Sequence, residues 1–352
     1  MMNSKTNKKQ LIIFLIVAYG VTYLMGLLMW YGNTKQLDLS AFANTQMMYP
    51  AAGVMLAYLL TRRDDLNLPK WFYRVFILIT ALMLISTIMT VFQPEKILET
   101  AGGNISFWLM AMQIFMMGGS ILCWIFLLAA GKKRRAAYGL KWQNWKTSLF
   151  CIVLFLILYF LRAGISFTAS GQLEIFTSIL TSPDTWIYIA SMPISFLLAF
   201  IAFFGEEYGW RYYLQPILQK RFGLRYGVLI LGVVWGLWHL PVDLFFYTSP
   251  EQGLIMLISQ IITCVTYGIF FGYVYMRTNN IWAVVIIHFL NNNLIPVISG
   301  TYSADVIQNQ AVSWSQIPWA LLLNGLLFGL FLFARPFRKK NDDICSFSVS
   351  ER

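Results

Sequence analysis

The sequence predicts an all-α protein, a polytopic bundle of about ten transmembrane helices with both termini in the cytoplasm. The 352-residue chain is 58% hydrophobic and only 12% charged, whereas soluble domains carry about 25% charged residues. Apolar runs of about twenty residues recur along the chain, long enough to cross a bilayer as helices. The basic residues fall almost entirely into alternate connections between these runs, which is typical of membrane topology.

The apolar runs are continuous, which excludes a transmembrane barrel with strictly alternating strands. Lipid offers no hydrogen-bond partner to exposed backbone groups, so each run is expected to be helical. The predicted spans are 11–31, 44–61, 72–92, 106–131, 147–165, 185–205, 226–246, 254–276, 281–298 and 316–334.

The basic residues fix the predicted orientation of these spans. If the N-terminus is cytoplasmic, 23 of the 26 lysines and arginines fall in inside segments and only Lys35, Lys96 and Arg162 fall outside. This positive-inside pattern accounts for the net charge of +11 without a nucleic-acid partner. We interpret the run Lys132–Arg135 in the same way, as a topology signal that contacts anionic lipid.

The ionisable residues divide the chain into three predicted parts. Residues 1–170 form N-terminal transmembrane helices of unassigned role, because they place few ionisable groups inside their spans. Residues 171–300 form a catalytic helical core that contains a cluster of them. Residues 301–352 supply a last transmembrane helix and a basic cytoplasmic tail.

The first candidate site is the stretch FFGEEYGWRYY at Phe203–Tyr213. On a helix, Glu207 and Arg211 are four residues apart and share a face, so they are expected to form a structural ion pair. Glu206 is rotated by about 100° from Glu207, and Trp210 stands four residues after it. Glu206 is therefore the carboxylate without a local cation and the candidate proton acceptor.

Both histidines of the chain lie inside predicted spans, where ionisable groups usually face a bundle interior or a wet cavity. His288 and Asn292 are four residues apart, and two converging donors of this kind could hold an oxyanion. Asn291 and Asn293 are expected to point elsewhere on the helix.

The other histidine, His239, shares a helix face with Trp235, which is expected to form a wall of the site. Asp243 could orient the His239 ring from four residues further on, although Pro241 is expected to disturb that spacing. Counted from Arg225, His239 lies about 21 Å into its span, whereas Glu206 is expected near the cytoplasmic end of its own span.

Two chemical interpretations follow from these residues. In the first, Glu206 deprotonates a water molecule that His239 positions, while His288 and Asn292 stabilise a tetrahedral oxyanion, and no cofactor is needed. In the second, Glu206, His239 and His288 bind a divalent metal such as zinc, since one carboxylate and two imidazoles match a catalytic zinc set. The spacing does not decide between them, because the chain lacks an HExxH motif.

Three motifs in this region resemble those of the CPBP intramembrane proteases, a family that includes CAAX prenyl proteases, bacteriocin-processing enzymes and the Abi group. The first is E-E-Y-G-W-R at Glu206–Arg211, the second W-G-L-W-H at Trp235–His239, and the third H-F-L-N-N at His288–Asn292. The resemblance covers roughly Ile187–Pro296. Trp235 stands where the family usually has phenylalanine, and only a small effect is expected from this change.

The resemblance implies an intramembrane endopeptidase that cuts near the C-terminus of a membrane-associated protein or peptide, or a role in bacteriocin maturation or immunity. By this analogy Glu206 and His239 activate water, and His288 and Asn292 form the oxyanion hole. The implied partners are membrane lipid and a peptide or protein substrate that is in some cases lipidated. The implied location is a bacterial cell membrane, with the active site open to the cytoplasm.

Two alternative functions are compatible with the same residues. Intramembrane glutamate, histidine and arginine also form proton relays in ion-coupled transporters, and interrupted helices would favour that function. A catalytically silent immunity or scaffold protein that has kept the motifs is the other alternative.

Overall fold

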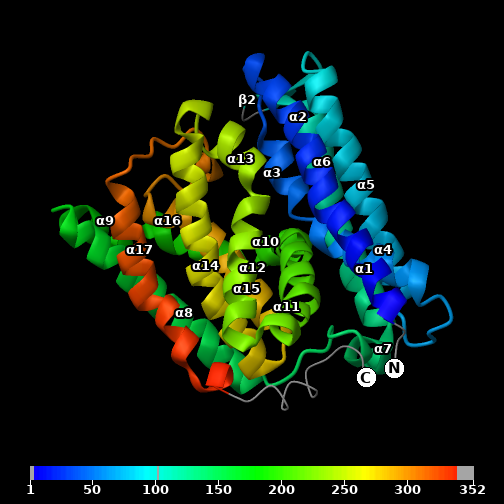
Figure 1. Ribbon diagram of the computed structural model, residues 1–352. Coiled ribbons are helices and arrows are strands. Elements are labelled where there is room, and N and C mark those ends of the chain that lie inside the picture. Colours follow the sequence, from blue (N-terminus) through cyan, green and yellow to red (C-terminus); the bar gives the residue numbers. More distant parts are fainter. Residues whose placement is uncertain (1–3, 101–102, 339–352) are drawn as a thin grey trace.

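The structure, a computed structural model, describes residues 4–100 and 103–338 and confirms the predicted all-α helical bundle (Figure 1). One feature lies outside that class. β1 (Ile97–Thr100) and β2 (Gly103–Ser106) form a short antiparallel pair between the third and fourth predicted spans.

The helices follow the chain order of the apolar runs. The first part contains α1 (Ser4–Leu15), the π-helix η1 (Ile16–Val21), α2 (Thr22–Thr34), α3 (Ser40–Gln46), α4 (Tyr49–Thr61), α5 (Lys70–Phe92), α6 (Phe107–Ala129), α7 (Gly131–Ala137), α8 (Trp145–Ala169) and α9 (Leu173–Thr181). The second part contains α10 (Pro183–Glu207), the π-helix η2 (Tyr208–Leu214), α11 (Gln215–Phe222), α12 (Leu224–Trp238), α13 (Leu240–Val242), η3 (Asp243–Tyr247), η4 (Pro250–Gln252), α14 (Gly253–Thr278), α15 (Ile281–Asn293), α16 (Ile295–Ile298), η5 (Ala304–Ile307), α17 (Gln316–Leu327), η6 (Gly329–Phe333) and η7 (Arg335–Arg338).

The predicted count of ten spans is not confirmed. Among the described residues, seven helical stretches are long and apolar enough to cross a membrane, and a pair bent by 44° at the end of α12 makes an eighth if it is one span. The segments predicted at 44–61 and 316–334 contain α4 and α17, which have 13 and 12 residues. A helix needs about 17 residues or more to span the hydrocarbon core, so these two segments are too short by themselves.

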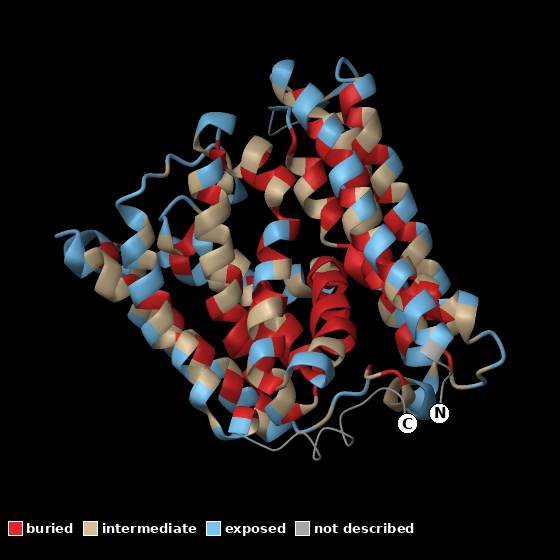
Figure 2. Ribbon diagram, in the orientation of Figure 1, coloured by how far each residue is buried: buried red, intermediate tan, exposed pale blue. Residues whose placement is uncertain are grey.

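The outer helices present apolar side chains outward, as a lipid-facing surface requires. On α6, Ile121, Ile125 and Leu128 are exposed, while Gly119 and Cys123 on the opposite side are buried. Figure 2 shows exposed positions along the outer helices and buried ones gathered at the centre of the bundle, around α10 and α12. Apolar side chains that would be a liability in water are the expected surface of a membrane helix.

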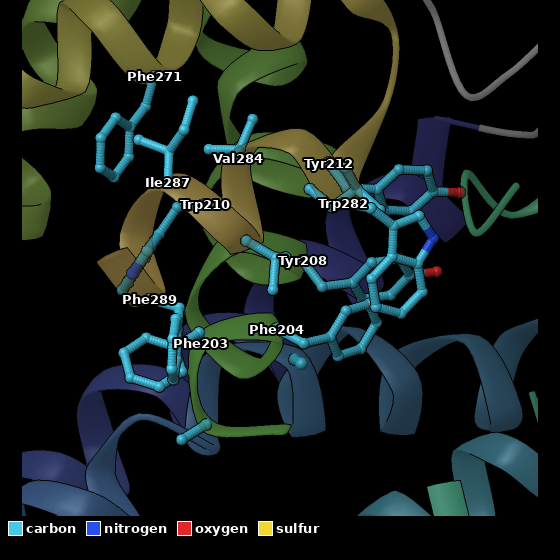
Figure 3. Packing of buried hydrophobic residues seen from close by; sticks show 14 of the residues in the cluster. Phe203, Phe204, Tyr208, Trp210, Tyr212, Phe271, Trp282, Val284, Ile287 and Phe289 are labelled. Atoms are coloured by element: carbon cyan, nitrogen blue, oxygen red, sulfur yellow. The ribbon is translucent and has the colours of Figure 1, made fainter. Parts of the chain in front are cut away.

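The centre of the bundle is built around η2, in which all seven residues are buried. The rings of Tyr208 and Tyr212 are stacked with their centroids 4.4 Å apart, and Trp210 packs edge-on against Phe14 of α1. Figure 3 shows these aromatic residues beside Phe203 and Phe204 of α10. This packing holds the glutamates at the end of α10 inside the protein rather than at its surface.

Two glycines bring this central helix against the start of α4. A Cβ atom at Gly205 would lie 3.0 Å from the Cα of Met48, and one at Gly209 would lie 2.9 Å from the carbonyl carbon of Pro50. Small residues allow such close backbone contact between membrane helices. The N-terminal helices are thereby packed directly onto the segment that carries Glu206.

The first described helix begins, and the last one ends, at the same end of the bundle. In Figure 1, α1 begins and η7 ends at the same end, where α7 with its four basic residues also lies. This agrees with the predicted gathering of basic connections on one side. The assignment of that side to the cytoplasm stays a prediction.

Candidate active site

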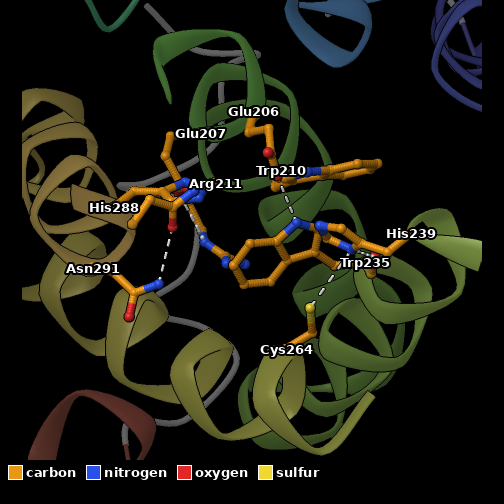
Figure 4. A network of polar contacts seen from close by, with 10 residues as sticks. Glu206, Glu207, Trp210, Arg211, Trp235, His239, Cys264, His288 and Asn291 are labelled. Carbon is orange, nitrogen blue, oxygen red and sulfur yellow. Dashed lines mark hydrogen bonds and ion pairs between the residues drawn. The ribbon is translucent and has the colours of Figure 1, made fainter. Parts of the chain in front are cut away.

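The four predicted catalytic residues line a single cavity of about 370 Å³. Glu206 lies one residue before the end of α10, His239 lies at the break between α12 and α13, and His288 and Asn292 come from α15. Side chains far apart in the sequence are therefore brought to one internal space. Figure 4 shows the polar contacts that Glu206, His239 and His288 make with neighbouring side chains.

Glu206 is buried, with only 2% of its surface exposed, and two indoles hold its carboxylate. Its Oε2 atom accepts a hydrogen bond from Nε1 of Trp235 at 2.7 Å and another from Nε1 of Trp210 at 3.3 Å. Both donors use the same oxygen, which leaves Oε1 as the acceptor for a ligand. Trp235 thus does more than form the predicted aromatic wall, because it donates to the carboxylate itself.

The predicted ion pair between Glu207 and Arg211 is present and fully buried. The Nε atom of Arg211 lies 3.0 Å from Oε2 of Glu207, and both side chains are 0% exposed. The guanidinium carbon is 4.6 Å from the centre of the Trp235 ring, so a cation–π contact adds to the pair. Among the described residues, neither Nη atom of Arg211 has a hydrogen-bond partner.

The other oxygen of Glu207 holds His288, a contact that the sequence did not reveal. Nδ1 of His288 lies 2.8 Å from Oε1 of Glu207. A carboxylate accepts hydrogen bonds, so Nδ1 carries the hydrogen and the other ring nitrogen, Nε2, is available to a ligand. Glu207 therefore orients His288 while it pairs with Arg211.

His239 is oriented by the main chain rather than by Asp243. Nδ1 of His239 lies 2.9 Å from the carbonyl oxygen of Trp235, which can only accept, so Nδ1 donates and Nε2 is left as an acceptor. The Sγ atom of Cys264 is 3.9 Å from the same Nδ1. The helix break at His239 agrees with the predicted disturbance by Pro241.

The role predicted loosely for Asp243 has no support in the structure. Its backbone N–H donates to the carbonyl of His239 at 2.9 Å, and its side chain makes no contact with the imidazole. Both carboxyl oxygens are buried without a hydrogen-bond partner among the described residues.

The asparagines after His288 differ in part from the prediction. Asn292 lines the cavity as expected, but so does Asn291, which was expected to point elsewhere. Nδ2 of Asn291 donates to Oδ1 of Asn292 at 3.0 Å, so the two side chains lie together at the end of α15. Asn293 points away, as predicted, and donates to the carbonyl of Phe289 at 2.9 Å.

The helical stretch that carries Glu206 does not end at residue 205, so Glu206 is not at its end as predicted. One apolar helical stretch runs over Pro183–Phe222 and continues through η2 and α11. At 1.5 Å per residue, Glu206 lies about 22 Å from Arg221, and His239 lies about 21 Å from Arg225. The two side chains are therefore at similar depths from the basic end, which removes the discrepancy that the sequence left.

Several lining residues come from helices to which the sequence assigned no role. Ala43, Gln46 and Met47 line the cavity from α3 and the residue after it, and Arg162 lines it from α8. Nε2 of Gln46 donates to the carbonyl of Trp238 at 3.1 Å, next to His239. For Ala43, Gln46 and Met47, nothing in the sequence indicated a contact with the cavity.

The count of basic residues placed Arg162 on the outer side, at the end of the predicted span 147–165. The residue is inside α8, seven positions before the helix ends at Ala169. A charged residue within a transmembrane helix is by itself a signal for a functional site. The sequence contained this signal, but Arg162 was used only in the count of basic residues that set the predicted topology.

The lining of the cavity does not favour access from the end where α1 begins. Ile307 and Gln310 line it, and they belong to the connection between α16 and α17. In Figure 1 this connection lies at the end of the bundle opposite to the start of α1 and to α7. The prediction of a cavity open to the cytoplasmic side is thus without structural support.

The three candidate metal ligands do not form a compact ligand group. Within residues 4–100 and 103–338, no set of three or more His, Cys, Asp or Glu side chains is arranged to hold a metal ion. Glu206 already receives two indole N–H donors on one oxygen, and Nδ1 of each histidine has a partner in the protein. The hydrolysis considered for this site therefore includes no step on a metal ion.

Comparison with known proteins gives one family and one curated relative. Residues 188–294 match the family described as type II CAAX prenyl endopeptidase Rce1-like. A protein of Methanococcus maripaludis named CAAX prenyl protease 2 is 28% identical over 122 residues, which is 33% of this chain and 45% of that protein. The match therefore spans less than half of the relative. No solved structure matches the chain.

Proposed function

We propose that this chain is an intramembrane endopeptidase of the CPBP family, because residues 188–294 match the Rce1-like CAAX prenyl endopeptidase family and a CAAX prenyl protease is similar to the chain. It cuts a peptide bond near the C-terminus of a membrane-associated protein or peptide. The observation that carries the proposal is the single cavity that Glu206, His239, His288 and Asn292 share inside an apolar bundle.

Glu206 acts as the general base in this proposal. Its Oε2 atom is fixed by Trp235 and Trp210, and Oε1 takes a proton from a water molecule in the cavity. The acceptor nitrogen Nε2 of His239 accepts a hydrogen bond from the other O–H of that water, which stays covalently intact, and so positions it. The hydroxide oxygen then bonds to the carbonyl carbon, and the carbonyl electron pair moves to its oxygen.

His288 and Asn292 stabilise the oxyanion that results. With Nδ1 of His288 donating to Glu207, donation from Nε2 as well requires the imidazolium form, whose charge Glu207 balances. The amide of Asn292 supplies a second donor, and its oxygen is held by Asn291. When the carbon–nitrogen bond breaks, Glu206 returns its proton to the leaving amine, so the base is regenerated.

The substrate proposed here is a peptide with an accessible C-terminal segment in the membrane. CAAX-type processing of a lipidated protein and maturation of a bacteriocin precursor both supply such a segment. Membrane lipid is the surrounding partner, because the outer helices expose apolar side chains.

A purified sample in detergent tests the proposal with a quenched fluorescent peptide library. We expect cleavage by the wild type and none by Glu206→Gln, which keeps the shape of the side chain and removes its basic oxygen. Glu251→Gln alters an exposed glutamate of η4 and serves as the matched control. Equal signals from wild type and Glu206→Gln would end the case for a peptidase that uses this carboxylate.

The same assay tests the metal alternative. We expect a membrane-permeant chelator to leave cleavage unchanged, because no described ligand group surrounds the cavity. Loss of cleavage on chelation, with recovery after zinc is added back, would instead support metal-dependent hydrolysis.

One observation favours a second candidate function, ion- or proton-coupled transport. The helix break at His239 bends the α12 segment by 44°, and interrupted helices line the binding sites of many transporters. Proton uptake into vesicles that contain the protein, abolished in Glu206→Gln without any peptide cleavage by the wild type, would support transport.

A further inference from the structure

Arg162 is the one residue of α8 that lines the catalytic cavity, and the proposed hydrolysis does not use it. It lies in the same internal space as Glu206, His239 and His288. An arginine at membrane depth is costly and is usually retained for a contact with an anion or a polar group. The contacts of its guanidinium therefore indicate what it is there to bind.

The guanidinium is held in place by a buried amide. Nε of Arg162 donates to Oδ1 of Asn324 on α17 at 2.6 Å, and Asn324 is 0% exposed. Since Nε can only donate, the oxygen of the amide must face it. Nδ2 of Asn324 is buried and has no acceptor among the described residues. The amide Nδ2 of Asn324 thus adds an unpaired donor beside the guanidinium of Arg162.

No carboxylate of the described chain neutralises Arg162. The two ion pairs found within residues 4–100 and 103–338 both belong to Glu207, with Arg211 and with His288. An arginine that is held only through Nε keeps its two terminal nitrogens for a ligand. These two nitrogens match the two oxygens of a carboxylate, which is the geometry of a bidentate pair.

On the proposed peptidase function, we infer that Arg162 binds the α-carboxylate at the C-terminus of the substrate. A peptidase that cuts near the C-terminus leaves only a few residues between the reacting carbonyl and that carboxylate. Both must then lie in one cavity, and the 370 Å³ cavity has Glu206 and Arg162 in its lining.

The position of Arg162 favours a peptide carboxylate over a lipid phosphate. The residue lies seven positions before the end of α8, or about 10 Å along the helix axis. Lipid phosphates lie about 15 Å or more from the bilayer centre, whereas Arg162 lies only about 8 Å from the middle of α8. The enzyme would thus bind the C-terminal carboxylate of its substrate and hydrolyse a peptide bond at a fixed distance from that group.

Paired peptides that differ only at the last group test this inference. One peptide ends in a free acid and the other in an amide, and kcat/KM is measured for each. We expect the wild type to prefer the free acid by about 10- to 100-fold, the range for one charge-assisted hydrogen-bonded pair. Arg162→Gln should lower the rate for the free acid to that for the amide and leave the amide rate unchanged.

Two further variants sharpen the test. Arg162→Lys keeps the charge without the planar fork and should retain only part of the preference. Arg221→Gln removes an exposed cation of α11 and should retain all of it. A preference that survives Arg162→Gln, or an equal fall of both peptides, would overturn the inference, because a merely structural role would not distinguish the two end groups.

The lipid alternative and failure of the proposed function give different results. If Arg162 binds a lipid phosphate, the wild type shows no acid preference, and its rate depends on the phosphatidylglycerol content of the vesicles in a way that Arg162→Gln abolishes. If the wild type cleaves neither peptide, the proposed function fails. Binding of the two peptides to Glu206→Gln protein, measured by fluorescence anisotropy, then still shows whether Arg162 selects the free acid.

Discussion

The buried charge cluster can be tested by Arg211→Met, which removes the guanidinium and keeps an apolar stem. Arg211 and Glu207 are both 0% exposed and lie 3.0 Å apart. Removal of one partner from a buried ion pair costs about 3–5 kcal/mol, because the remaining charge stays buried without compensation. Loss of the cation–π contact with Trp235, 4.6 Å from the guanidinium carbon, adds up to about 2 kcal/mol.

His288 limits this loss, because it stays 2.8 Å from Glu207 in the variant. We therefore expect a net destabilisation of about 3 kcal/mol or more, seen as a lower yield of monodisperse protein and a lower melting temperature in detergent. Arg221→Met changes an exposed arginine of α11 and should stay within about 0.5 kcal/mol of the wild type.

The double variant Glu207→Gln/Arg211→Met separates charge burial from packing. It leaves no uncompensated carboxylate, so it should recover a large part of the stability lost in Arg211→Met. If Arg211→Met were produced and melted like the wild type, and only the cleavage rate fell, the structural role given to Arg211 would be refuted in favour of a direct role in the reaction.

Three further predictions concern the cavity and its support. Trp235→Phe keeps an aromatic ring and loses the 2.7 Å hydrogen bond to Glu206, the proposed base. We expect kcat to fall about 10- to 100-fold, with a smaller loss of thermal stability than in Arg211→Met; wild-type kinetics would show that this donor is dispensable. Asn292→Ala should leave the yield intact and slow turnover by about 100-fold, and unchanged turnover would remove Asn292 from the oxyanion site. Gly205→Ala places a Cβ atom 3.0 Å from the Cα of Met48 and should lower the free energy of unfolding by about 1–3 kcal/mol. In the control Gly118→Ala the new Cβ meets nothing within 4 Å, so stability should not change.

The contacts that could be predicted are those set by helix periodicity. Glu207 and Arg211 are four residues apart and form the ion pair predicted from that spacing. Glu206 and Trp210 have the same spacing and are hydrogen-bonded, a contact that was not predicted. These pairs form even though η2, a π-helix, begins at Tyr208. The spacing of residues along one helix follows from the sequence alone. Such contacts can therefore be predicted without knowing how neighbouring helices pack.

The contacts that could not be predicted join different helices. The pair between Glu207 and His288 links residues 81 positions apart, and the bond from Trp235 to Glu206 spans 29. The angle of each helix about its axis decides which side chains meet, and that angle depends on packing. Asn291 illustrates the limit, because its place in the cavity follows from how α15 is rotated against its neighbours.

The wall that α3 contributes has a consequence for how such proteins diverge. The proposed catalytic residues all lie within 188–294, the part that matches the family, whereas Ala43, Gln46 and Met47 come from outside it. Substitutions in those three can reshape that wall of the cavity and leave the proposed catalytic residues unchanged. Related proteins could therefore come to differ in substrate preference through changes in α3, a segment outside the region that matches the family.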